Sequence, residues 1–315
     1  MKVAAVQMEA ELANVNANLK IAERLAESAF RDGAEMVIIP EFFTTAMGFH
    51  PKMLDSVRKI DGKPLLMLKN LAAKYKGIIG GSFIASRGQD AYNTFILVFP
   101  DGKMFFHDKD QPTMWENCYY IAGNDDGVLE TPLGNIGVAL CWELVRSRTP
   151  KRLLNRVDMV VGGSCWWTLP EAQVPGFPLN LDDQVVKILV ETPLKLARML
   201  GVHVIHASHA GKLDGKMPLI PGFQYKSHYC GETQIVDGSG KILERMKHEE
   251  GEGYITADID PKQKWNPYEP IPNRFWIPQL PLQIRFIWFY QNLYGKRYYY
   301  PKIAKRYWKK RNILH

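Results

Sequence analysis

Three residues of types that can do covalent chemistry each follow a stretch of sequence that is typical of a buried strand. Glu41 ends AEMVIIPE, Lys109 follows MFFHD, and Cys141 ends NIGVALC. Each also has an ordinary structural explanation: an acid at a cap, a lysine in a hairpin, or a thiol packed as a small hydrophobe. Because ligands of α/β proteins bind at the carboxyl ends of the strands, we expect the three side chains at one edge of a sheet.

Together these residue types would support nucleophilic attack on a carbonyl carbon. A thiol is a strong nucleophile once a base removes its proton, and a cation or amide donors must stabilise the oxyanion that forms. Glu41 would supply the base and Lys109 the cation. A turn after Cys141 would add the backbone N–H of Trp142 as an oxyanion donor, helped by the N-terminus of a following helix.

The elements that must position these residues alternate between buried strands and amphipathic helices. In the first half, strands are predicted at 2–8, 34–43 and 78–86 and helices at 17–33 and 65–77. Residues 93–110 contain two strand-like runs around an Asp-Gly turn, which predicts a hairpin. The chain thus opens as strand, helix, strand and then adds antiparallel pairing.

The same order of elements recurs in the second half. Strands are predicted at 135–141, 158–164 and 202–210, a helix at 143–157, a Pro-rich loop at 169–178, a long helix ending near Gly201, and a hairpin at 233–246 with its turn at 237–240. Two similar halves packed face to face would give an α/β fold, a four-layer α-β-β-α sandwich.

Several separated motifs resemble those of the nitrilase superfamily of carbon–nitrogen hydrolases. They are PEFF with Glu41, HDKDQP with Lys109 and ALCWE with Cys141, together with VAAVQM, IAGND and GETQIVDGSGKIL. The resemblance extends over roughly residues 1–260. It implies the α-β-β-α sandwich, no metal, no cofactor, a homodimer or larger assembly, and a covalent acyl-enzyme made by a Glu-Lys-Cys triad.

The resemblance also implies roles for individual residues. Glu41 would take the thiol proton, pass it to the leaving amine and then activate water, while Lys109 would steady the tetrahedral oxyanion. Members of the superfamily use a second glutamate between the lysine and the cysteine, and Glu116 in PTMWENCYY is the candidate. Its ordinary explanation is a solvated acid in a loop.

The run CWELVRSRTPKR departs from the common pattern, in which an aspartate follows the aromatic residue. Glu143 at this place is similar to the nitrilase branch, but one residue does not decide between nitrile and amide, because the triad serves both. Since amide hydrolysis is the commoner activity of the superfamily, the leading prediction is an amidase on a small or lipophilic linear amide. A nitrilase, which would pass through a thioimidate, and an N-acyltransferase are the alternatives.

A few further residues are candidates for the substrate pocket. Cys165, Trp166 and Trp167 follow another predicted strand, although paired tryptophans often serve packing alone. His206 is a weaker candidate, and no acid or cysteine completes a metal site with the neighbouring histidines. The non-enzyme alternative is a scaffold or binding protein with a vestigial triad, which the presence of all three triad residues disfavours.

The charge of the chain is unevenly distributed. The net charge is +7 over 315 residues, but residues 270–315 contain ten Lys or Arg and no Asp or Glu, so the remainder carries 30 basic and 33 acidic residues. Four cysteines show no pairing or zinc pattern, and the N-terminal sequence does not fit a signal peptide. These features predict a reduced, cytoplasmic setting.

The basic residues define a tail, 270–315, that we separate from a carbon–nitrogen hydrolase domain at 1–269. The tail holds twelve of the 36 aromatic residues, and its apolar run FIWFY is too short to span a bilayer. Such a segment can lie on an anionic membrane, clasp a partner subunit or bind nucleic acid. Of these, we favour attachment of the tail to an anionic membrane, at the inner face of that membrane. Nucleic acid is disfavoured because the body is acidic and no reader module is recognisable.

Overall fold

The computed structural model describes residues 1–170, 181–216, 224–277 and 282–304, so most of the predicted Pro-rich loop lies outside the described residues. The strands are β1 (Lys2–Met8), β2 (Met36–Ile38), β3 (Arg58–Lys59), β4 (Ile78–Arg87), β5 (Asp90–Val98), β6 (Met104–Asp108), β7 (Val128–Thr131), β8 (Gly134–Leu140), β9 (Met159–Ser164), β10 (His203–His209), β11 (Lys212–Lys216), β12 (Gln224–His228), β13 (Gly231–Val236), β14 (Ile242–Lys247) and β15 (Gly253–Asp258). The α-helices are α1 (Val15–Arg31), α2 (Lys63–Tyr75), α3 (Arg148–Leu153), α4 (Leu181–Leu200) and α5 (Leu282–Tyr299). Short helical turns are η1 (Pro51–Asp55), η2 (Met114–Cys118), η3 (Cys141–Val145), η4 (His248–Glu250) and η5 (Tyr300–Ala304).

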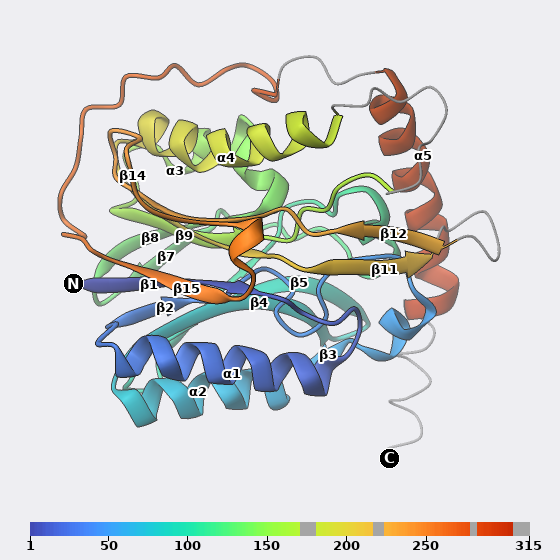
Figure 1. Ribbon diagram of the computed structural model, residues 1–315, viewed down its shortest axis with the longest axis horizontal. Coiled ribbons are helices and arrows are strands. Elements are labelled where there is room, and N and C mark those ends of the chain that lie inside the picture. The colour runs from blue at the N-terminus through green and yellow to red at the C-terminus, as the bar shows by residue number, and fades with distance from the viewer. Residues whose placement is uncertain (171–180, 217–223, 278–281, 305–315) are drawn as a thin grey trace.

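Helices cover the strands on two opposite sides. Figure 1 shows α1 and α2 on one side, α3 and α4 on the other, and two layers of strands between them. The α-β-β-α sandwich predicted from the sequence is therefore confirmed. In α1, the side chain of Asn14 caps the helix by accepting the N–H of Ala17, and the buried residues recur at helical spacing along one face.

The two halves of the sheet repeat one pattern. In the first half β1, β2 and β4 run parallel and are followed by antiparallel β5 and β6; in the second, β8, β9 and β10 run parallel and are followed by antiparallel β13 and β14. The halves join where β1 pairs with β10, through Gln7 with Ser208 and Met8 with His209. This is the repetition that the sequence predicts.

Alternating residues of the strands fill two different cores. Val3 and Ala5 of β1 belong to the apolar cluster between the two strand layers, which also contains Val138 and Ile205 of the other half. The intervening residue Ala4 packs instead in the cluster that includes α1 and α2. Successive side chains of a strand point to opposite faces of the sheet. Because both faces are buried here, apolar residues occupy successive positions and the strands appear in the sequence as continuous apolar runs.

The sequence-based prediction of one helix over residues 143–157 is wrong. The structure has the turn η3 and the separate short helix α3, with Arg146 in an extended conformation between them. Pro150 has no N–H to bond the carbonyl of Arg146, which disfavours a continuous helix through this region. The predicted strand at 34–43 also ends early, at Ile38, before Pro40 and a turn in which Phe42 has a φ of +54°.

The tail forms the helix α5 at one edge of the sandwich, where it crosses the strand and helix layers (Figure 1). It packs against η2 of its own chain, and Tyr299 near its end is completely buried. No helix in the described part of the chain is long and apolar enough to cross a membrane.

Candidate active site

Glu41, Lys109 and Cys141 meet at the carboxyl ends of their strands. Glu41 lies three residues after β2, Lys109 directly follows β6, and Cys141 directly follows β8. Glu116, the second glutamate that the family resemblance implies, joins this group from the turn η2. All four side chains are buried. A carboxylate oxygen of Glu41, a carboxylate oxygen of Glu116 and Sγ of Cys141 lie within 4.8 Å of one another.

The ammonium of Lys109 lies between the two glutamates. Its Nζ is 2.8 Å from Oε1 of Glu41 and 2.8 Å from Oε2 of Glu116, and it stands 5.7 Å from the ring centre of Phe42. Burial alone would lower the pKa of Lys109, but the charge of the Cys141 thiolate, where it forms, and the negative charges of Glu116 and Glu41 outweigh burial and hold the pKa well above its usual value. Although two carboxylates and a thiol at this spacing could hold a metal ion, the lysine already provides the cation between them.

Glu41 is fixed by neighbours that lie in β5 and β10 and directly after β9. It accepts hydrogen bonds from Nδ2 of Asn93 at 2.8 Å and from the backbone N–H of Cys165 at 3.2 Å, while its main-chain carbonyl accepts one from Nε2 of His209 at 2.7 Å. Burial raises the pKa of Glu41 to about 7, with the nearby ammonium of Lys109 acting in the opposite direction. A carboxyl group of this pKa can both accept and return a proton near neutral pH.

Glu116 is a buried residue of the site and not a solvated loop acid. Its Oε2 accepts the backbone N–H of Thr113 at 2.8 Å and the hydroxyl of Tyr120, in addition to the ammonium of Lys109. The bond from Thr113 closes a capping box at the start of η2, so the same carboxylate shapes the turn that carries it.

Cys141 is the first residue of η3 and has a φ of +52°, a conformation that non-glycine residues rarely adopt. Its side chain is 1% exposed. Burial raises the pKa of the Cys141 thiol well above its usual value, the negative charge of Glu41 adds to this, and Lys109 opposes it. The thiol is therefore protonated at neutral pH, so a base must take its proton during any attack.

Glu143 joins the ends of two strands of the site. Its carboxylate is completely buried and is bonded by the backbone N–H groups of Leu140 and Asp110, by Arg152 and by His107, at 2.9, 3.0, 2.9 and 3.1 Å. Because Asp110 follows Lys109 and Leu140 precedes Cys141, this one acid fixes both backbone segments. The sequence alone indicated no structural role for Glu143, which stands where the family pattern has an aspartate.

The predicted pocket residues lie around the group to different degrees. Trp166 shares an apolar cluster with Cys141 and stacks on Trp142 with ring centres 5.3 Å apart. Trp167 stacks on Trp115, the neighbour of Glu116, at 4.9 Å. Cys165 touches Glu41 through its backbone, as described above.

His206 is not brought to this group. It hydrogen-bonds Oγ of Ser164 at 2.9 Å and the carbonyl of Glu232 at 3.3 Å, and burial lowers its pKa to about 4. It is a neutral histidine within the sheet. The histidine that reaches Glu41 is His209, three residues further along β10, and the alternation of side chains along a strand accounts for the difference.

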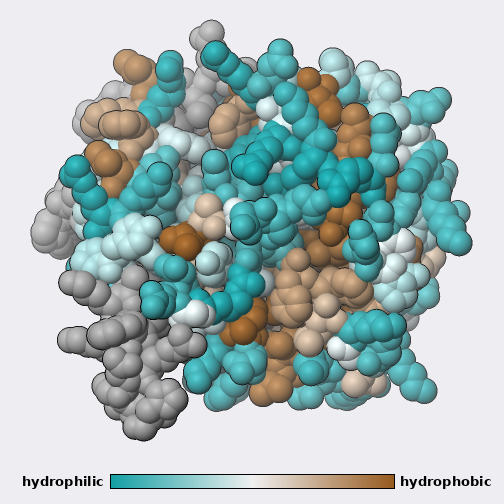
Figure 2. Space-filling view, turned by 180° about the vertical axis from the view of Figure 1, so that it is seen from behind, coloured by the Kyte–Doolittle hydropathy of each residue, from teal (hydrophilic) through white to brown (hydrophobic). Residues whose placement is uncertain are grey.

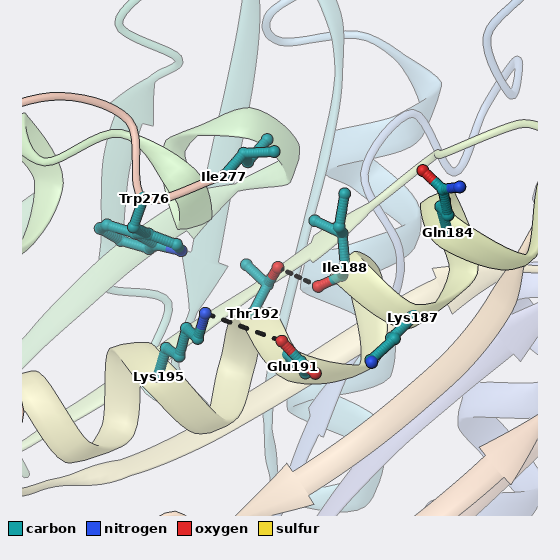
Figure 3. A pocket seen from close by; sticks show the side chains of 8 residues that line it. All are labelled: Gln184, Lys187, Ile188, Glu191, Thr192, Lys195, Trp276 and Ile277. Atoms are coloured by element: carbon teal, nitrogen blue, oxygen red, sulfur yellow. Dashed lines mark hydrogen bonds and ion pairs between the residues drawn. The ribbon is translucent and has the colours of Figure 1, made fainter. Parts of the chain in front are cut away.

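A cavity of about 230 Å³ borders the apolar cluster that contains Cys141. Figure 3 shows Trp276 and Ile277 on one side of it and the α4 residues from Gln184 to Lys195 on the other. Ile188, Trp276 and Ile277 belong to both the cavity wall and the cluster. Glu191 and Lys195 form an ion pair of 3.7 Å at its border (Figure 3).

A family model described as carbon-nitrogen hydrolase matches residues 2–264 of this chain. The chain belongs to the carbon-nitrogen hydrolase family. The carbon-nitrogen hydrolases to which it is similar include Nitrilase 3 of Arabidopsis thaliana, 27% identical over 293 residues that cover 82% of this chain and 79% of the relative. Another is the 2-oxoglutaramate amidase of Bacillus subtilis, 23% identical over 275 residues that cover 86% and 95%.

The fold is also found among solved carbon-nitrogen hydrolases. The crystal structure of such a hydrolase from Helicobacter pylori G27 aligns with a TM-score of 0.70 at 16% sequence identity, covering 83% of this chain and 89% of that one. At this identity the likeness shows the fold alone. The predicted membership of the nitrilase superfamily and the predicted fold are both confirmed.

Sequence reasoning missed several residues of the site. Asn93 and Tyr120 bond Glu41 and Glu116, and His209 bonds the backbone of Glu41. Only Asn93 left a signal, because it is a polar residue at the start of an apolar run and would need a partner once buried. Nothing in the sequence near Tyr120 indicates its contact.

Proposed function

We propose that this carbon-nitrogen hydrolase is a cysteine-dependent amidase that hydrolyses small or lipophilic linear amides through a thioester acyl-enzyme. The observation that carries the proposal is the ammonium of Lys109, held 2.8 Å from both Glu41 and Glu116 beside the thiol of Cys141. A base, a cation and a nucleophile in one buried group are the components that acyl transfer from an amide needs.

In the acylation step, Sγ of Cys141 attacks the amide carbon while Glu41 takes the thiol proton. With a pKa of about 7, the Glu41 carboxyl is ionised in about half of the molecules at neutral pH, and an ionised Glu41 beside a protonated thiol is the starting state for this transfer. The carbonyl oxygen becomes an oxyanion, stabilised by the ammonium of Lys109 and by the backbone N–H of Trp142. That N–H lies in the first turn of η3, where it has no carbonyl within the turn to bond.

The tetrahedral intermediate then collapses by breaking the carbon–nitrogen bond. Glu41 returns its proton to the leaving nitrogen, so an amine or ammonia departs and the acyl group stays on Cys141 as a thioester. A water molecule enters, Glu41 takes one of its protons, and the hydroxide adds to the thioester carbon. The thiolate leaves, regains the proton from Glu41, and the acid product is released.

Glu116 has a different task in this scheme. Its contact with Lys109 at 2.8 Å orients the ammonium and balances its charge during both steps. It can also accept a hydrogen bond from the N–H of the bound amide, which would align the scissile bond with Cys141.

The apolar surroundings of Cys141 support a lipophilic acyl group. Trp142, Trp166, Leu189 and Trp276 lie in or against the same cluster as the nucleophile. Nitrile hydrolysis through a thioimidate and acyl transfer to an amine remain alternatives, because the same residues serve all three reactions and the named relatives include nitrilases and amidases.

The test is hydrolysis of a panel of matched amides and nitriles of increasing acyl chain length, with and without an added amine. We expect acid and ammonia or amine from the amides, at rates that increase with apolar chain length up to the size that Trp166 admits, and no turnover by Cys141→Ala. Turnover of nitriles alone would favour the nitrilase, and an N-acyl product formed in preference to the acid would favour the transferase. An equal rate for Cys141→Ala would contradict the mechanism.

We also propose that the tail attaches the enzyme to an anionic membrane surface on the cytoplasmic side, where its four free cysteines would stay reduced. Along α5 the exposed side chains of Leu282, Phe286, Phe289 and Leu293, 76, 68, 68 and 43% exposed, recur at helical spacing. Figure 2 shows apolar side chains set among hydrophilic ones along this edge of the molecule. Such a stripe on a segment with ten cations and no acid matches an interface of apolar chains and anionic head groups.

Co-sedimentation of the full chain with phosphatidylcholine vesicles, with and without phosphatidylserine, tests this attachment. We expect pelleting that requires phosphatidylserine, decreases with salt and is lost in a Phe286→Ser/Phe289→Ser double variant. Leu66→Ser, which removes an exposed apolar side chain of α2, is the matched control and should pellet like the wild type. If the double variant pellets as much as the wild type, the proposal is contradicted. If the wild type is a dimer that the double substitution dissociates, the stripe instead binds a second copy of the chain.

A further inference from the structure

The inner face of α5 touches both turns that carry the site. η2 carries Glu116 and η3 begins with Cys141. In each turn, α5 contacts the residue that directly follows this site residue. Asn117 meets Asn292 and Gly295 of α5, and Trp142 meets Trp288. Since residues 288, 292 and 295 recur at helical spacing, one face of a single helix bridges the two turns.

The contact with η2 is close and directional. Nδ2 of Asn117 donates a hydrogen bond of 2.8 Å to Oδ1 of Asn292. Gly295 allows the helix backbone to approach, because a Cβ atom placed there would lie 2.6 Å from Cβ of Asn117 and 3.0 Å from N of Cys118. Any side chain at position 295 must therefore displace η2 or the helix.

The contact with η3 is aromatic. The rings of Trp288 and Trp142 meet at 68° with centres 4.4 Å apart, and Trp142 also stacks on Trp166. Trp142 thus contacts the tail and also packs against the apolar cluster around Cys141. The indole that follows the nucleophile therefore contacts both the tail and Trp166, and these contacts restrict the residue whose backbone N–H we propose as an oxyanion donor.

The far end of α5 is anchored to the body. The hydroxyl of Tyr299 donates to Oδ1 of Asp90 at 3.0 Å and accepts the N–H of Ala91 at 2.9 Å. The helix therefore has a fixed position along the edge of the sandwich, with the outer stripe facing away and the inner face against the two turns.

We propose that α5 is a positioning element for the reaction: through Asn292, Gly295 and Trp288 it sets the position of η2, and with it Glu116, relative to the nucleophile turn η3. The inference rests on the proposed amide hydrolysis. Asn292 and Trp288 are positioning residues, because each acts through a neighbour of a reacting group. An error of about 1 Å in the placement of such a group lowers rates by about 100-fold.

The test compares four full-length variants with the wild type. Asn292→Leu removes the acceptor for Asn117, and Asn292→Asp keeps an acceptor at the same place. Gly295→Ala adds the Cβ that must push on η2, although alanine is the better helix former. Phe289→Ala, on the outward face of the same helix, is the matched control. The readouts are kcat and KM on the best amide, the unfolding midpoint, and the pH dependence of iodoacetamide alkylation at Cys141.

We expect Asn292→Leu and Gly295→Ala to lower kcat by about 10- to 100-fold with KM nearly unchanged, and to shift the pH midpoint of Cys141 alkylation. Asn292→Asp should recover kcat, and Phe289→Ala should match the wild type. Unfolding midpoints should remain close to that of the control. A loss of kcat that follows the unfolding midpoint, or an Asn292→Leu enzyme with wild-type kcat, would overturn the inference.

The alkylation readout separates this inference from the proposed function. If the wild type hydrolyses no amide or nitrile, the proposed function fails. A shifted alkylation midpoint in Asn292→Leu and Gly295→Ala but not in Phe289→Ala would still support positioning by α5. If the wild type hydrolyses amides while all four variants match it in rate and in alkylation, only the positioning role is refuted.

Discussion

The ammonium nitrogen of Lys109 lies 2.8 Å from a carboxylate oxygen of Glu41, and neither side chain reaches solvent. Taking two charges out of water offsets much of their attraction, so a buried ion pair adds little net stability. Its importance here should therefore appear mainly in the chemistry. Because Glu116 contacts the same ammonium from the other side, Lys109 is the centre of the charged group.

Replacing Lys109 by methionine should reduce kcat by about 100- to 1,000-fold, since one of the donors to the oxyanion is lost. It should also destabilise the fold by about 3–5 kcal/mol at neutral pH, because Glu41 and Glu116 are left buried without their cation. Steady-state kinetics and urea unfolding measure the two effects. Lys103→Met, at an exposed lysine of the same hairpin, should change neither; an active Lys109→Met enzyme would rule out the oxyanion role.

The pH dependence of the reaction should follow Glu41. This carboxyl must be ionised to accept the thiol proton, and burial raises its pKa to about 7. We therefore expect kcat/KM on an amide to rise as the pH increases through about 7 and then to reach a plateau, because Lys109 stays protonated to much higher pH. The measurement is kcat/KM at constant ionic strength. A rate that is already maximal at pH 5 would show that another group is the base.

The stability of the fold should depend on His107 in the alkaline range. Burial alone would lower the pKa of His107, but Glu143 and Asp125 raise it from 6.5 to about 9. A folded-state pKa above the unfolded value means that the contribution is complete below pH 6.5 and is lost as the pH rises through about 9. The difference between the folded-state and unfolded-state pKa of His107 corresponds to about 3 kcal/mol in the free energy of unfolding.

The measurement is the free energy of unfolding of wild type and His107→Gln at several pH values. The free energy of unfolding of the wild type minus that of His107→Gln should decrease by about 3 kcal/mol between pH 6 and pH 10. His248→Gln, at a histidine outside this network, is the control. A difference that does not vary with pH would mean that His107 is not charged in the fold.

Trp166 should limit the size of the acyl group. It is 5% exposed and shares the apolar cluster of Cys141. Trp166→Phe would free space beside the nucleophile, so the ratio of kcat/KM for a longer over a shorter linear amide should increase by about 10-fold or more. Trp265→Phe, which changes a tryptophan packed on His203, is the control. An unchanged ratio would place the acyl chain elsewhere.

The sequence predicted the layers and the strand-end residues because both depend on local patterns. Apolar runs and amphipathic spacing located most strands and helices, and the Asp-Gly turn located the β5–β6 hairpin. Strand ends then placed Glu41, Lys109 and Cys141 at one edge. Glu116 came only from the family resemblance, since nothing in its own segment indicates burial.

Long-range contacts account for what the sequence could not predict. His209 bonds the backbone of Glu41 across 168 residues, and Asn117 bonds Asn292 across 175. No local pattern encodes such partners. The basic composition of residues 270–315 suggested an external partner, yet one face of α5 is occupied by the chain itself. Composition reports the charge of a segment and not which of its faces is buried.

The central claim is that Cys141 forms a covalent acyl intermediate. Intact-protein mass spectrometry after brief exposure to a mixed set of amides, esters and nitriles tests it most directly, with wild type compared with Cys141→Ala. We predict an adduct on the wild type alone, with the mass of the acyl group, which would also identify the substrate class. If the wild type forms no adduct and Cys141 is also inert to iodoacetamide at neutral pH, the thiol is an unactivated core residue and the account is wrong.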